Sequence, residues 1–342
     1  MFTPVIAAGV NALKQINYFS TLSQPGYNDD EDLKGTLVGK FLRAVRNITV
    51  TAGTIGAAGV WYRKRAERLM SLRAQTVLIT GAGSGIGRLL ALGAAKRAAA
   101  HVVVWDINEE TVSEVVQEIS ALGVDASYDV VDVASDSSVD AAGEAVRHRI
   151  GGVDFLIHNA GVVTGKPFLD QSHQDVTNTF QVNTLALYRV TRQFLPNMLS
   201  NQFGSITVLA SAASLTGVAR QTDYAASKWA AHGFTESLRA EMRHFGHNIH
   251  TLSVHPFYVS TGMFAGASSP NALLPILEPD AAVEKIFRTL EAGKNQLFLP
   301  VTVAVAKWLN VLPVPVADQI RDLLGINSTM DHFVGRHSEV PA

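Results

Sequence analysis

The sequence predicts an α/β fold in which helices cover both faces of one doubly wound parallel sheet. Short, almost entirely apolar runs such as Thr76–Thr80 and Val153–His158 alternate with segments of helical periodicity such as Glu109–Leu122. Runs this apolar are typical of strands buried on both faces of a parallel sheet. Because strand and helix alternate repeatedly, we expect right-handed crossovers between neighbouring strands.

Seven such runs are the predicted strands of a single domain over residues 74–300. In chain order they are Thr76–Thr80, His101–Trp105, Ser127–Val131, Val153–His158, Ser205–Ala210, Ile249–Val254 and Gln296–Leu299. The clearest predicted helices between them, where apolar residues recur at helical spacing, are Arg88–Ala98, Glu109–Leu122 and Asp136–Ile150.

The composition excludes several classes of protein. A hydrophobic content of 47% with 17% charged residues excludes a disordered chain. The chain has no cysteine, which excludes disulfides, a thiol nucleophile and cysteine-ligated metals. Its histidines and carboxylates show no metal-ligand spacing, so no metal is expected. Residues 76–342 hold 18 basic and 25 acidic side chains, which argues against a nucleic-acid-binding surface.

The N-terminal part of the chain is basic and is predicted to contact a membrane. We expect a weakly ordered lead-in over 1–35 and an amphipathic, then apolar, helical segment over 36–73. The uncharged stretch Ile48–Tyr62 would span about 22 Å as a helix, less than the ~30 Å core of a bilayer. Arg63-Lys64-Arg65 follows it and suits an interfacial boundary. The segment is therefore a strained span, an interfacial hairpin, or a helix that packs on the body or on a partner.

A glycine-rich turn, Thr80–Gly87, directly follows the first predicted strand and opens a helix. In this setting the glycines let the backbone approach a pyrophosphate, whose charge faces the helix N-terminus. The residues expected to bind a dinucleotide there are Gly81, Ser84, Gly85, Ile86 and Gly87.

Asp106 directly follows the second predicted strand and indicates which dinucleotide binds. An acidic side chain at this position accepts hydrogen bonds from the ribose hydroxyls and repels a 2′-phosphate. We therefore expect NAD rather than NADP, the alternative being that Arg88 or Lys96 neutralises such a phosphate.

Tyr224 and Lys228 are the predicted reacting pair. Four residues apart on a helix, their side chains share one face, and a nearby ammonium lowers the pKa of a phenol towards neutrality. Tyr224 would then exchange a proton with a substrate oxygen while a hydride moves to or from nicotinamide. Ser211, thirteen residues earlier at the end of a predicted strand, would hold the same oxygen, and the nearby Ser214 is the alternative hydroxyl.

Taken together, these residues resemble the short-chain dehydrogenase/reductase family. The resemblance rests on Thr80–Gly87, Asn159-Ala160-Gly161, Asn183, Ser211, Tyr224 and Lys228, in this order and spacing. It implies a Rossmann-like sheet of about seven strands in the order 3-2-1-4-5-6-7, and a homodimer or homotetramer. It also implies Tyr224 as general acid/base, Lys228 on the nicotinamide ribose, Ser211 as the substrate-orienting hydroxyl and Asn183 on a proton-relay water.

The same resemblance assigns the remaining cofactor-binding residues. They are Asp132 and Val133 at the adenine, Asn159, Ala160 and Gly161 along the cofactor, and Pro256, Val259 and Thr261 after the sixth strand. Two positions depart from the family pattern. His158 stands where an asparagine is usual, and Phe257 stands where a glycine is expected, so that Phe257 would narrow the nicotinamide end of the pocket.

A narrower resemblance, to the membrane-associated retinol and 17-beta-hydroxysteroid dehydrogenase subgroup, spans residues 76–336. It rests on Leu78–Arg88, Val104–Asn108, Leu312-Pro313-Val314, Leu324–Asn327 and Met330–Arg336. It implies a retinoid, a steroid or a long-chain alcohol as substrate. It also implies a place at the endoplasmic reticulum or at lipid droplets, with the catalytic domain facing the cytosol.

The C-terminal part, 301–342, is predicted to be an apolar lid and tail. The stretch Leu297–Val316 has Lys307 as its one charged residue and carries three prolines. It is expected either to form a lid that dips into a membrane interface or to complete the core as a strand and a helix.

The leading prediction is NAD-dependent interconversion of an alcohol and a carbonyl on a lipophilic substrate, and two other functions stay open. A nucleotide-sugar epimerase shares the Tyr-x-x-x-Lys pair and NAD but needs a polar C-terminal sugar domain, whereas this C-terminus is apolar. A non-catalytic dinucleotide-binding scaffold on a lipid surface would lack a reacting residue, whereas all four are present.

Overall fold

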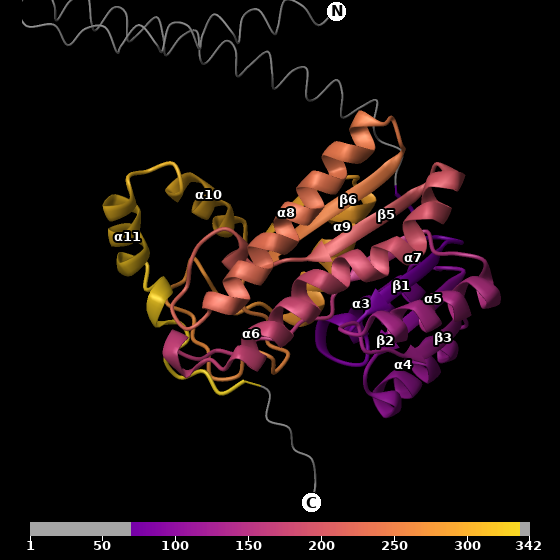
Figure 1. The fold of residues 1–342 in the computed structure, drawn as a ribbon, viewed down its shortest axis with the longest axis horizontal. Helices are drawn as coiled ribbons and strands as arrows, with labels where there is room; N and C mark the ends of the chain where they lie inside the picture. Colours follow the sequence, from indigo (N-terminus) through magenta and orange to yellow (C-terminus); the bar gives the residue numbers. More distant parts are fainter. Residues whose placement is uncertain (1–69, 336–342) are drawn as a thin grey trace, which may run out of the picture. The chain divides into compact units, whose positions relative to one another are not determined.

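The computed structural model describes residues 70–335, which fold around one parallel sheet of seven strands (Figure 1). The strands are β1 Thr76–Thr80, β2 His101–Asp106, β3 Asp125–Val130, β4 Phe155–His158, β5 Gly204–Leu209, β6 Ile249–Pro256 and β7 Gln296–Leu299. Their order across the sheet is β3-β2-β1-β4-β5-β6-β7, and every neighbouring pair is parallel. The fold class and strand order expected from the sequence are confirmed.

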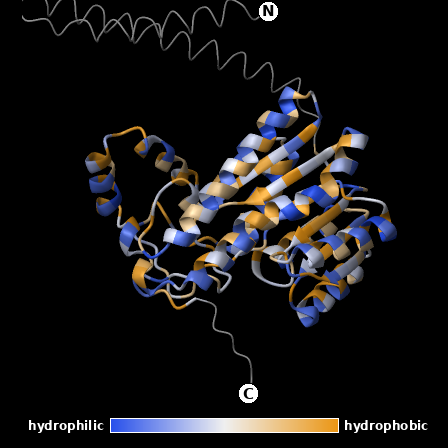
Figure 2. Ribbon diagram, in the orientation of Figure 1, coloured by the Kyte–Doolittle hydropathy of each residue, from blue (hydrophilic) through white to orange (hydrophobic). Residues whose placement is uncertain are grey.

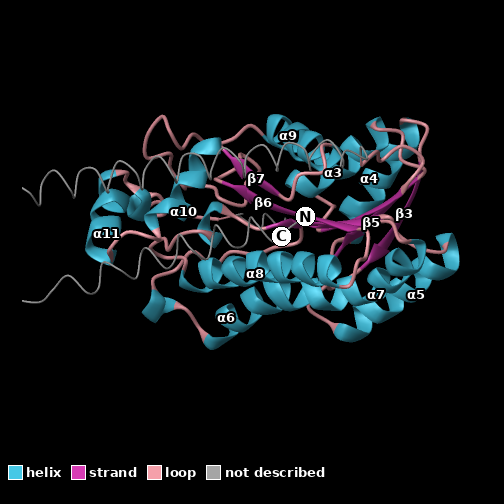
Figure 3. Cartoon of the chain, turned by 90° about the horizontal axis from the view of Figure 1, so that it is seen from above, coloured by secondary structure: helices cyan, strands magenta, loops and turns pink. Residues whose placement is uncertain are grey.

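Helices cover both faces of the sheet, as Figure 3 shows. Those on one face are α3 (Gly85–Lys96), α4 (Glu109–Ala121) and α9 (Pro279–Glu291). Those on the other face are α5 (Asp136–Ile150), α6 (His173–Phe180), α7 (Ala186–Asn201) and α8 (Thr222–His244). The helices carry the chain from one parallel strand to the next, so the inner strands are covered on both faces and read as continuous apolar runs.

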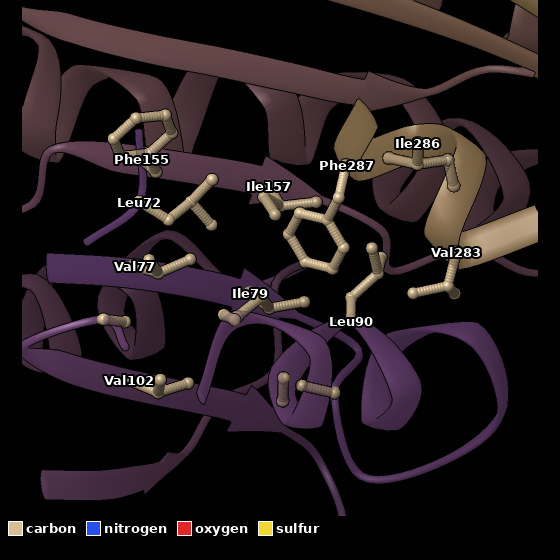
Figure 4. Packing of buried hydrophobic residues seen from close by; sticks show 14 of the residues in the cluster. Leu72, Val77, Ile79, Leu90, Val102, Phe155, Ile157, Val283, Ile286 and Phe287 are labelled. Carbon is tan, nitrogen blue, oxygen red and sulfur yellow. The ribbon is translucent and has the colours of Figure 1, made fainter. Parts of the chain in front are cut away.

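Two apolar layers hold these helices against the sheet. On the face of α3 and α9, Ile79, Leu90 and Phe287 belong to one buried cluster (Figure 4). On the opposite face, Trp105 of β2 packs against Phe194 of α7, with ring centroids 5.7 Å apart. Burying a side chain of this size contributes about 1.5–3 kcal/mol, and these contacts fix α3 and the turn before it relative to the sheet.

The packed body begins before the first strand. Leu72 is 1% exposed and belongs to the same buried cluster as Val77 and Phe155. The backbone N of Met70 donates to the carbonyl oxygen of Glu291 at 3.2 Å. The expected domain start at 74 therefore falls inside a segment that already packs on the domain. The expectations for residues 1–69 lie outside the described residues and stay predictions.

After β7 the chain forms a segment that we call the lid, residues 300–328. Its helical turns are η5 (Val301–Ala304), α10 (Val305–Leu309), α11 (Val314–Leu323) and η6 (Ile326–Ser328). In Figure 1 α10 and α11 lie apart from the sheet, beyond one end of it. The stretch Leu297–Val316 thus supplies the last strand of the sheet first and an outlying lid afterwards.

The lid mixes hydrophobic and hydrophilic residues (Figure 2), and we call the apolar side chains that line the cavity its inner face and the exposed ones its outer face. Val303 and Leu309 are buried, whereas Val301, Trp308 and Val311 are 73–77% exposed. Within residues 70–335, no helix is both long and apolar enough to cross a membrane.

Candidate active site

A cavity of about 620 Å³ opens at the carboxyl ends of the central strands. The strand order reverses between β1 and β4 at this edge, which is where open α/β sheets bind ligands. The sequence-predicted residues that line it are Gly81, Ser84, Gly85, Ile86, Asp106, Asp132, Val133, Asn159, Ala160, Gly161, Ser211, Tyr224, Lys228, Pro256, Val259 and Thr261. The other two, Gly87 and Asn183, lie behind the wall and contact residues that line it.

Two glycines shape the turn after β1. Gly81 has a φ of +64°, and a Cβ there would lie 2.7 Å from the Cα of Ala160. A Cβ on Gly87 would lie 2.0 Å from the carbonyl oxygen of Gly81. Only glycine fits either position, so backbone rather than side chains approaches the cavity here. Gly85 and Ile86 bring the N-terminus of α3 to the cavity wall, and a helix N-terminus binds phosphate.

Asn159 ties the ends of β1 and β4 together. Its Nδ2 donates to the carbonyl oxygens of Thr80 at 3.1 Å and Gly81 at 2.8 Å. The backbone N–H groups of Asn159 and Ala160 both donate to Thr80 Oγ1, at 3.1 and 3.2 Å. These bonds hold the loop after β4 against the glycine turn.

Asp106 lies at the end of β2 and is held at the cavity by backbone donors. Its Oδ2 accepts from Gly83 N at 2.9 Å, and its Oδ1 accepts from Ile107 N at 2.8 Å. A carboxylate has about four lone-pair sites, so Asp106 can still accept hydrogen bonds from the hydroxyl groups of a ligand. Arg88, one of the two basic residues considered for a 2′-phosphate, instead pairs with Glu118. Lys228 is the one lysine or arginine among the described residues that line the cavity.

Tyr224, Lys228 and Ser211 lie together at the end of β5. Tyr224 and Lys228 project from the start of α8 and are 4% and 5% exposed. Lys228 Nζ lies 5.7 Å from the centre of the Tyr224 ring and donates to the carbonyl oxygen of Leu209 at 2.8 Å. The Ser211 side chain hydrogen-bonds Tyr224, and its Oγ accepts from Ala213 N at 3.1 Å.

Burial governs the protonation of this group. It raises the pKa of Tyr224 above the ordinary value of a phenol, and the hydrogen bond with Ser211 offsets only part of that rise. It lowers the pKa of Lys228 to about 8. The expectation that Lys228 brings the pKa of Tyr224 towards neutrality is therefore wrong for this geometry, because desolvation disfavours the charged form of both side chains.

Asn183 lies in η3 (Gln181–Leu185), a π-helical turn between α6 and α7. Its Oδ1 accepts from Val162 N at 2.8 Å, and its Nδ2 donates to the carbonyl oxygen of Val162 at 2.9 Å and to Ser227 Oγ at 3.0 Å. A Cβ on Gly161 would lie 3.3 Å from Asn183 Oδ1. Asn183 thus joins the loop after β4 to α8, one residue before Lys228. Its expected role on a water stays a prediction.

The two departures from the family pattern leave the reacting residues in place. His158 is buried, its Nε2 is 2.9 Å from Thr191 Oγ1, and burial lowers its pKa to about 3. Phe257 lines the cavity and packs on Tyr258, with ring centroids 4.4 Å apart. An aromatic ring in the cavity wall is what the sequence predicts at this position.

The rest of the cavity is apolar and comes from segments without a recognisable motif. The lining residues that sequence reasoning missed include Phe264, Leu274, Val303, Leu309 and Ile326. Three of these belong to the lid, whose apolar composition was the one available signal. Composition does not show which side chains of such a segment face inwards, so these residues were not predicted singly.

The fold and the site define a class of protein, an oxidoreductase built on a dinucleotide-binding sheet. A family model, "short chain dehydrogenase", matches residues 75–272. The chain belongs to the short-chain dehydrogenase/reductase family.

Similar proteins place it within that family. Epidermal retinol dehydrogenase 2 of Homo sapiens is 40% identical over 274 residues, which cover 78% of this chain and 87% of the relative. Estradiol 17-beta-dehydrogenase 11 of Mus musculus is 36% identical over 273 residues, covering 79% and 89%. The chain is therefore an oxidoreductase acting on CH–OH groups, of the retinol and hydroxysteroid dehydrogenase subgroup.

Solved structures share the fold. A short-chain dehydrogenase/reductase of Burkholderia phymatum, in complex with NAD, superposes with a TM-score of 0.64 at 24% identity, covering 70% of this chain and 94% of that chain. A metagenomic short-chain oxidoreductase, in complex with NADP, superposes with a TM-score of 0.57 at 26% identity, covering 67% and 97%.

Proposed function

We propose that the protein interconverts an alcohol and a carbonyl on a lipophilic substrate, with NAD as hydride carrier and Tyr224 as general acid/base. One observation carries the proposal. A single cavity is lined by the glycine turn and Asp106, by Tyr224 and Ser211, and by apolar side chains of the lid. A cofactor, the proton-transferring group and a lipophilic substrate would share this space.

A nicotinamide dinucleotide fits the polar part of this lining, and the NAD- and NADP-bound structures of the same fold support that class. The glycine turn would hold the pyrophosphate, Asp106 the ribose hydroxyls, and Asp132 and Val133 the adenine. We assign NAD rather than NADP because the Asp106 carboxylate repels a 2′-phosphate, and because Arg88 pairs with Glu118.

The residues at the end of β5 are suited to move a proton. A bound nicotinamide supplies hydride transfer. Tyr224 is neutral, because burial raises its pKa, and donates its proton to a carbonyl oxygen in the reducing direction. In the oxidising direction the phenolate form of Tyr224 would take the proton of the alcohol and become the neutral phenol, and the positive charge of Lys228 favours that phenolate form, against the effect of burial. Ser211 holds the same substrate oxygen.

The apolar part of the cavity and the names of the relatives support a retinoid, a steroid or a long-chain alcohol as substrate. Among the described lining residues the charged ones are Asp106, Asp132 and Lys228, all assigned to the cofactor or the reaction. No charge is left over for a sugar phosphate, which disfavours the epimerase alternative.

We also propose that the protein works on a membrane or lipid-droplet surface, at the endoplasmic reticulum or on droplets, with the catalytic domain facing the cytosol. The lid supports this placement. Trp308 and Val311 of its outer face are exposed, whereas Val303 and Leu309 of its inner face line the cavity. Exposed apolar patches of this kind contact membranes or partners. The predicted anchor over 36–73 would add to the attachment.

Self-association into a dimer or tetramer is the assembly we propose. Tyr188 of α7 and Trp229 of α8 are 45% and 46% exposed, on helices of the same face of the sheet. Exposed aromatic side chains are enriched at protein interfaces. Light scattering behind size-exclusion chromatography tests this assembly, and a monomer at micromolar concentration would contradict it.

A substrate panel tests the proposed function. Full-length protein in detergent is assayed with all-trans-retinol, estradiol and dodecanol, and with UDP-glucose as polar control, each with NAD and with NADP. We expect kcat/KM with NAD for a lipophilic alcohol to exceed the polar control by roughly a hundredfold or more. Turnover of UDP-glucose alone would favour an epimerase, and cofactor binding without any turnover would favour a scaffold.

A further inference from the structure

Ser214 and His255 form a buried hydrogen-bonded pair next to Ser211. Ser214 lies in η4 (Ala212–Ser214), the turn after β5, and His255 lies near the end of β6. Both side chains are 0% exposed, and neither residue lines the cavity. His255 Nδ1 lies 2.7 Å from Ser214 Oγ, which donates to the carbonyl oxygen of Ser211 at 2.5 Å. The pair thus touches Ser211 without access to a substrate or cofactor.

The direction of these bonds follows from the number of protons. A serine hydroxyl has one proton, and that of Ser214 is donated to Ser211, so His255 Nδ1 must be the donor in the 2.7 Å contact. Burial lowers the pKa of His255 to about 3, so the ring is neutral and has a single N–H. Its Nε2 is then a bare acceptor, and Nε2 is a buried atom without a hydrogen-bond partner among the described residues.

Neighbouring rings hold the imidazole in this orientation. Phe298 of β7 stacks on His255, with ring centroids 5.0 Å apart and planes at 16°. His232 of α8 meets it edge-on, with centroids 4.7 Å apart and planes at 85°. Because one face and one edge of the ring are packed, Nδ1 stays aimed at Ser214.

Ser214 holds the backbone of Ser211 in place through two hydrogen bonds. Its carbonyl oxygen accepts from Ser214 N at 3.0 Å as well as from Ser214 Oγ. The same carbonyl raises the pKa of His255, partly offsetting burial, because it lies close enough to stabilise the ring N–H. Hydrogen bonds in series within a buried, low-dielectric site strengthen one another. The carbonyl of Ser211 is thus bound by Ser214, and Ser214 in turn is bound by His255 of β6.

We propose that His255 is a positioning residue that, through Ser214, fixes the backbone of Ser211 and so keeps the Ser211 hydroxyl beside Tyr224. This inference rests on the proposed function, in which Ser211 holds the reacting oxygen. Small displacements of such a group lower the rate of the chemical step. The effect therefore appears in kcat, while NAD binding, which uses other residues, is unaffected.

Three variants and one control test the proposal. His255→Leu keeps apolar volume but removes the donor, whereas His255→Asn places an amide N–H near the position of Nδ1. Ser214→Ala breaks the link with a smaller change in packing, which covers the case that His255→Leu does not fold. The matched control is His250→Leu on the same strand. His250 Nδ1 lies 3.0 Å from Ser205 Oγ, so it forms a similar histidine–serine contact, and neither of these two residues lines the cavity.

Two measurements are made on the full-length enzyme: steady-state kinetics with the best alcohol of the panel, and amide hydrogen exchange of the peptide covering 211–215. We expect His255→Leu and Ser214→Ala each to lower kcat about tenfold, the value of one lost hydrogen bond. The dissociation constant of NAD should change less than about twofold, and exchange in 211–215 should rise. His255→Asn should recover most of the lost kcat. The double variant that combines His255→Leu with Ser214→Ala should be no slower than either single variant.

Wild-type kcat and exchange in His255→Leu or Ser214→Ala would overturn the proposal. So would equal losses in His255→Asn and His255→Leu, or the same loss in His250→Leu. If wild-type enzyme turns over no alcohol, the proposed function fails. The exchange measurement needs no substrate and still tests the coupling of His255 to Ser211.

Discussion

Asp106 is the residue expected to select the dinucleotide, because its carboxylate is held at the cavity by Gly83 N and Ile107 N. Asp106→Ala removes the repulsion of a 2′-phosphate. It also removes the hydrogen bonds to the ribose, each of which contributes about 1 kcal/mol. We expect the affinity for NAD to fall by about tenfold or more and the preference to shift towards NADP. Competition binding measures both ligands, with Asp129→Ala as a control carboxylate outside the cavity. Wild-type protein that already prefers NADP would contradict the role of Asp106 in selecting NAD.

The burial of Lys228 lowers the free energy of unfolding by an amount that depends on pH. Its pKa is lowered to about 8 in the folded protein, so between pH 8 and about 10.5 the unfolded chain binds more protons and stability rises with pH. Relative to Lys228→Met, wild-type protein should therefore gain about 3 kcal/mol of unfolding free energy across this window. Urea unfolding of both proteins at pH 7.5, 9 and 10 measures the difference. A difference that does not change with pH would contradict the burial of a titrating Lys228.

Single residues could be predicted from the sequence where chemistry demands one residue type at one distance from a strand end. Gly81, Asp106 and Tyr224 are such cases, and all three line the cavity. The contact between Ser214 and His255 joins residues 41 positions apart, so no local pattern reveals it. The raised pKa of Tyr224 was missed for a similar reason, because the degree of burial is set by the whole site.

Strand boundaries were predicted to within two residues, and the errors do not follow burial alone. β1 and β7 lie where expected, although only Leu299 of β7 is buried. β5 is buried along its whole length and begins one residue before the expected start. The edge strand β3 begins at Asp125, two residues before the expected start, because most of its side chains are half-buried or exposed and no continuous apolar run marks it. β6 runs on to Pro256, since β7 pairs with it up to that residue.

The lid is the element expected to contact lipid. Trp308 and Val311 are 73% and 74% exposed, and burying side chains of this size in an interface contributes about 1.5–3 kcal/mol each. Trp308→Ser combined with Val311→Ser should therefore weaken binding to liposomes by tenfold or more, measured by flotation of the full-length protein. Phe245→Ser is the matched control, because Phe245 is 63% exposed beyond the C-terminal end of α8. If wild type and lid variant bind liposomes equally, the lid does not contribute to membrane binding, and other parts of the chain would have to provide it.

The domain as a unit should be sensitive to acid. His158 and His255 are buried and neutral, with pKa values lowered to about 3, whereas the unfolded chain protonates them near 6.5. The unfolded state then binds more protons below pH 6.5, so stability falls as pH falls. We expect a loss of about 4 kcal/mol of unfolding free energy between pH 7 and 5 from the two together. Urea unfolding measures the loss, and His158→Leu should reduce it by about 2 kcal/mol. An unchanged loss would show that His158 protonates in the folded state.

The architecture of residues 70–335 could be predicted because parallel strands and crossover helices leave a regular pattern in the sequence. The strand order and the position of the cavity followed from the family resemblance carried by Thr80–Gly87 and Tyr224. The substrate end could not be predicted at the level of residues, because Phe264, Val303 and Ile326 come from three separate segments that meet only in the folded protein.

Loss of the Tyr224 hydroxyl is the most direct measurement of the proposed chemistry. Tyr224→Phe keeps the ring that packs against Phe264, with centroids 5.8 Å apart, and removes the exchangeable proton. With the best lipophilic alcohol and NAD, we predict that kcat/KM falls by at least about a hundredfold. The dissociation constant of NAD should stay within about twofold of the wild-type value, which shows that the cavity is intact. Turnover near the wild-type rate in Tyr224→Phe would contradict Tyr224 as the general acid/base and, with it, the assignment of this site.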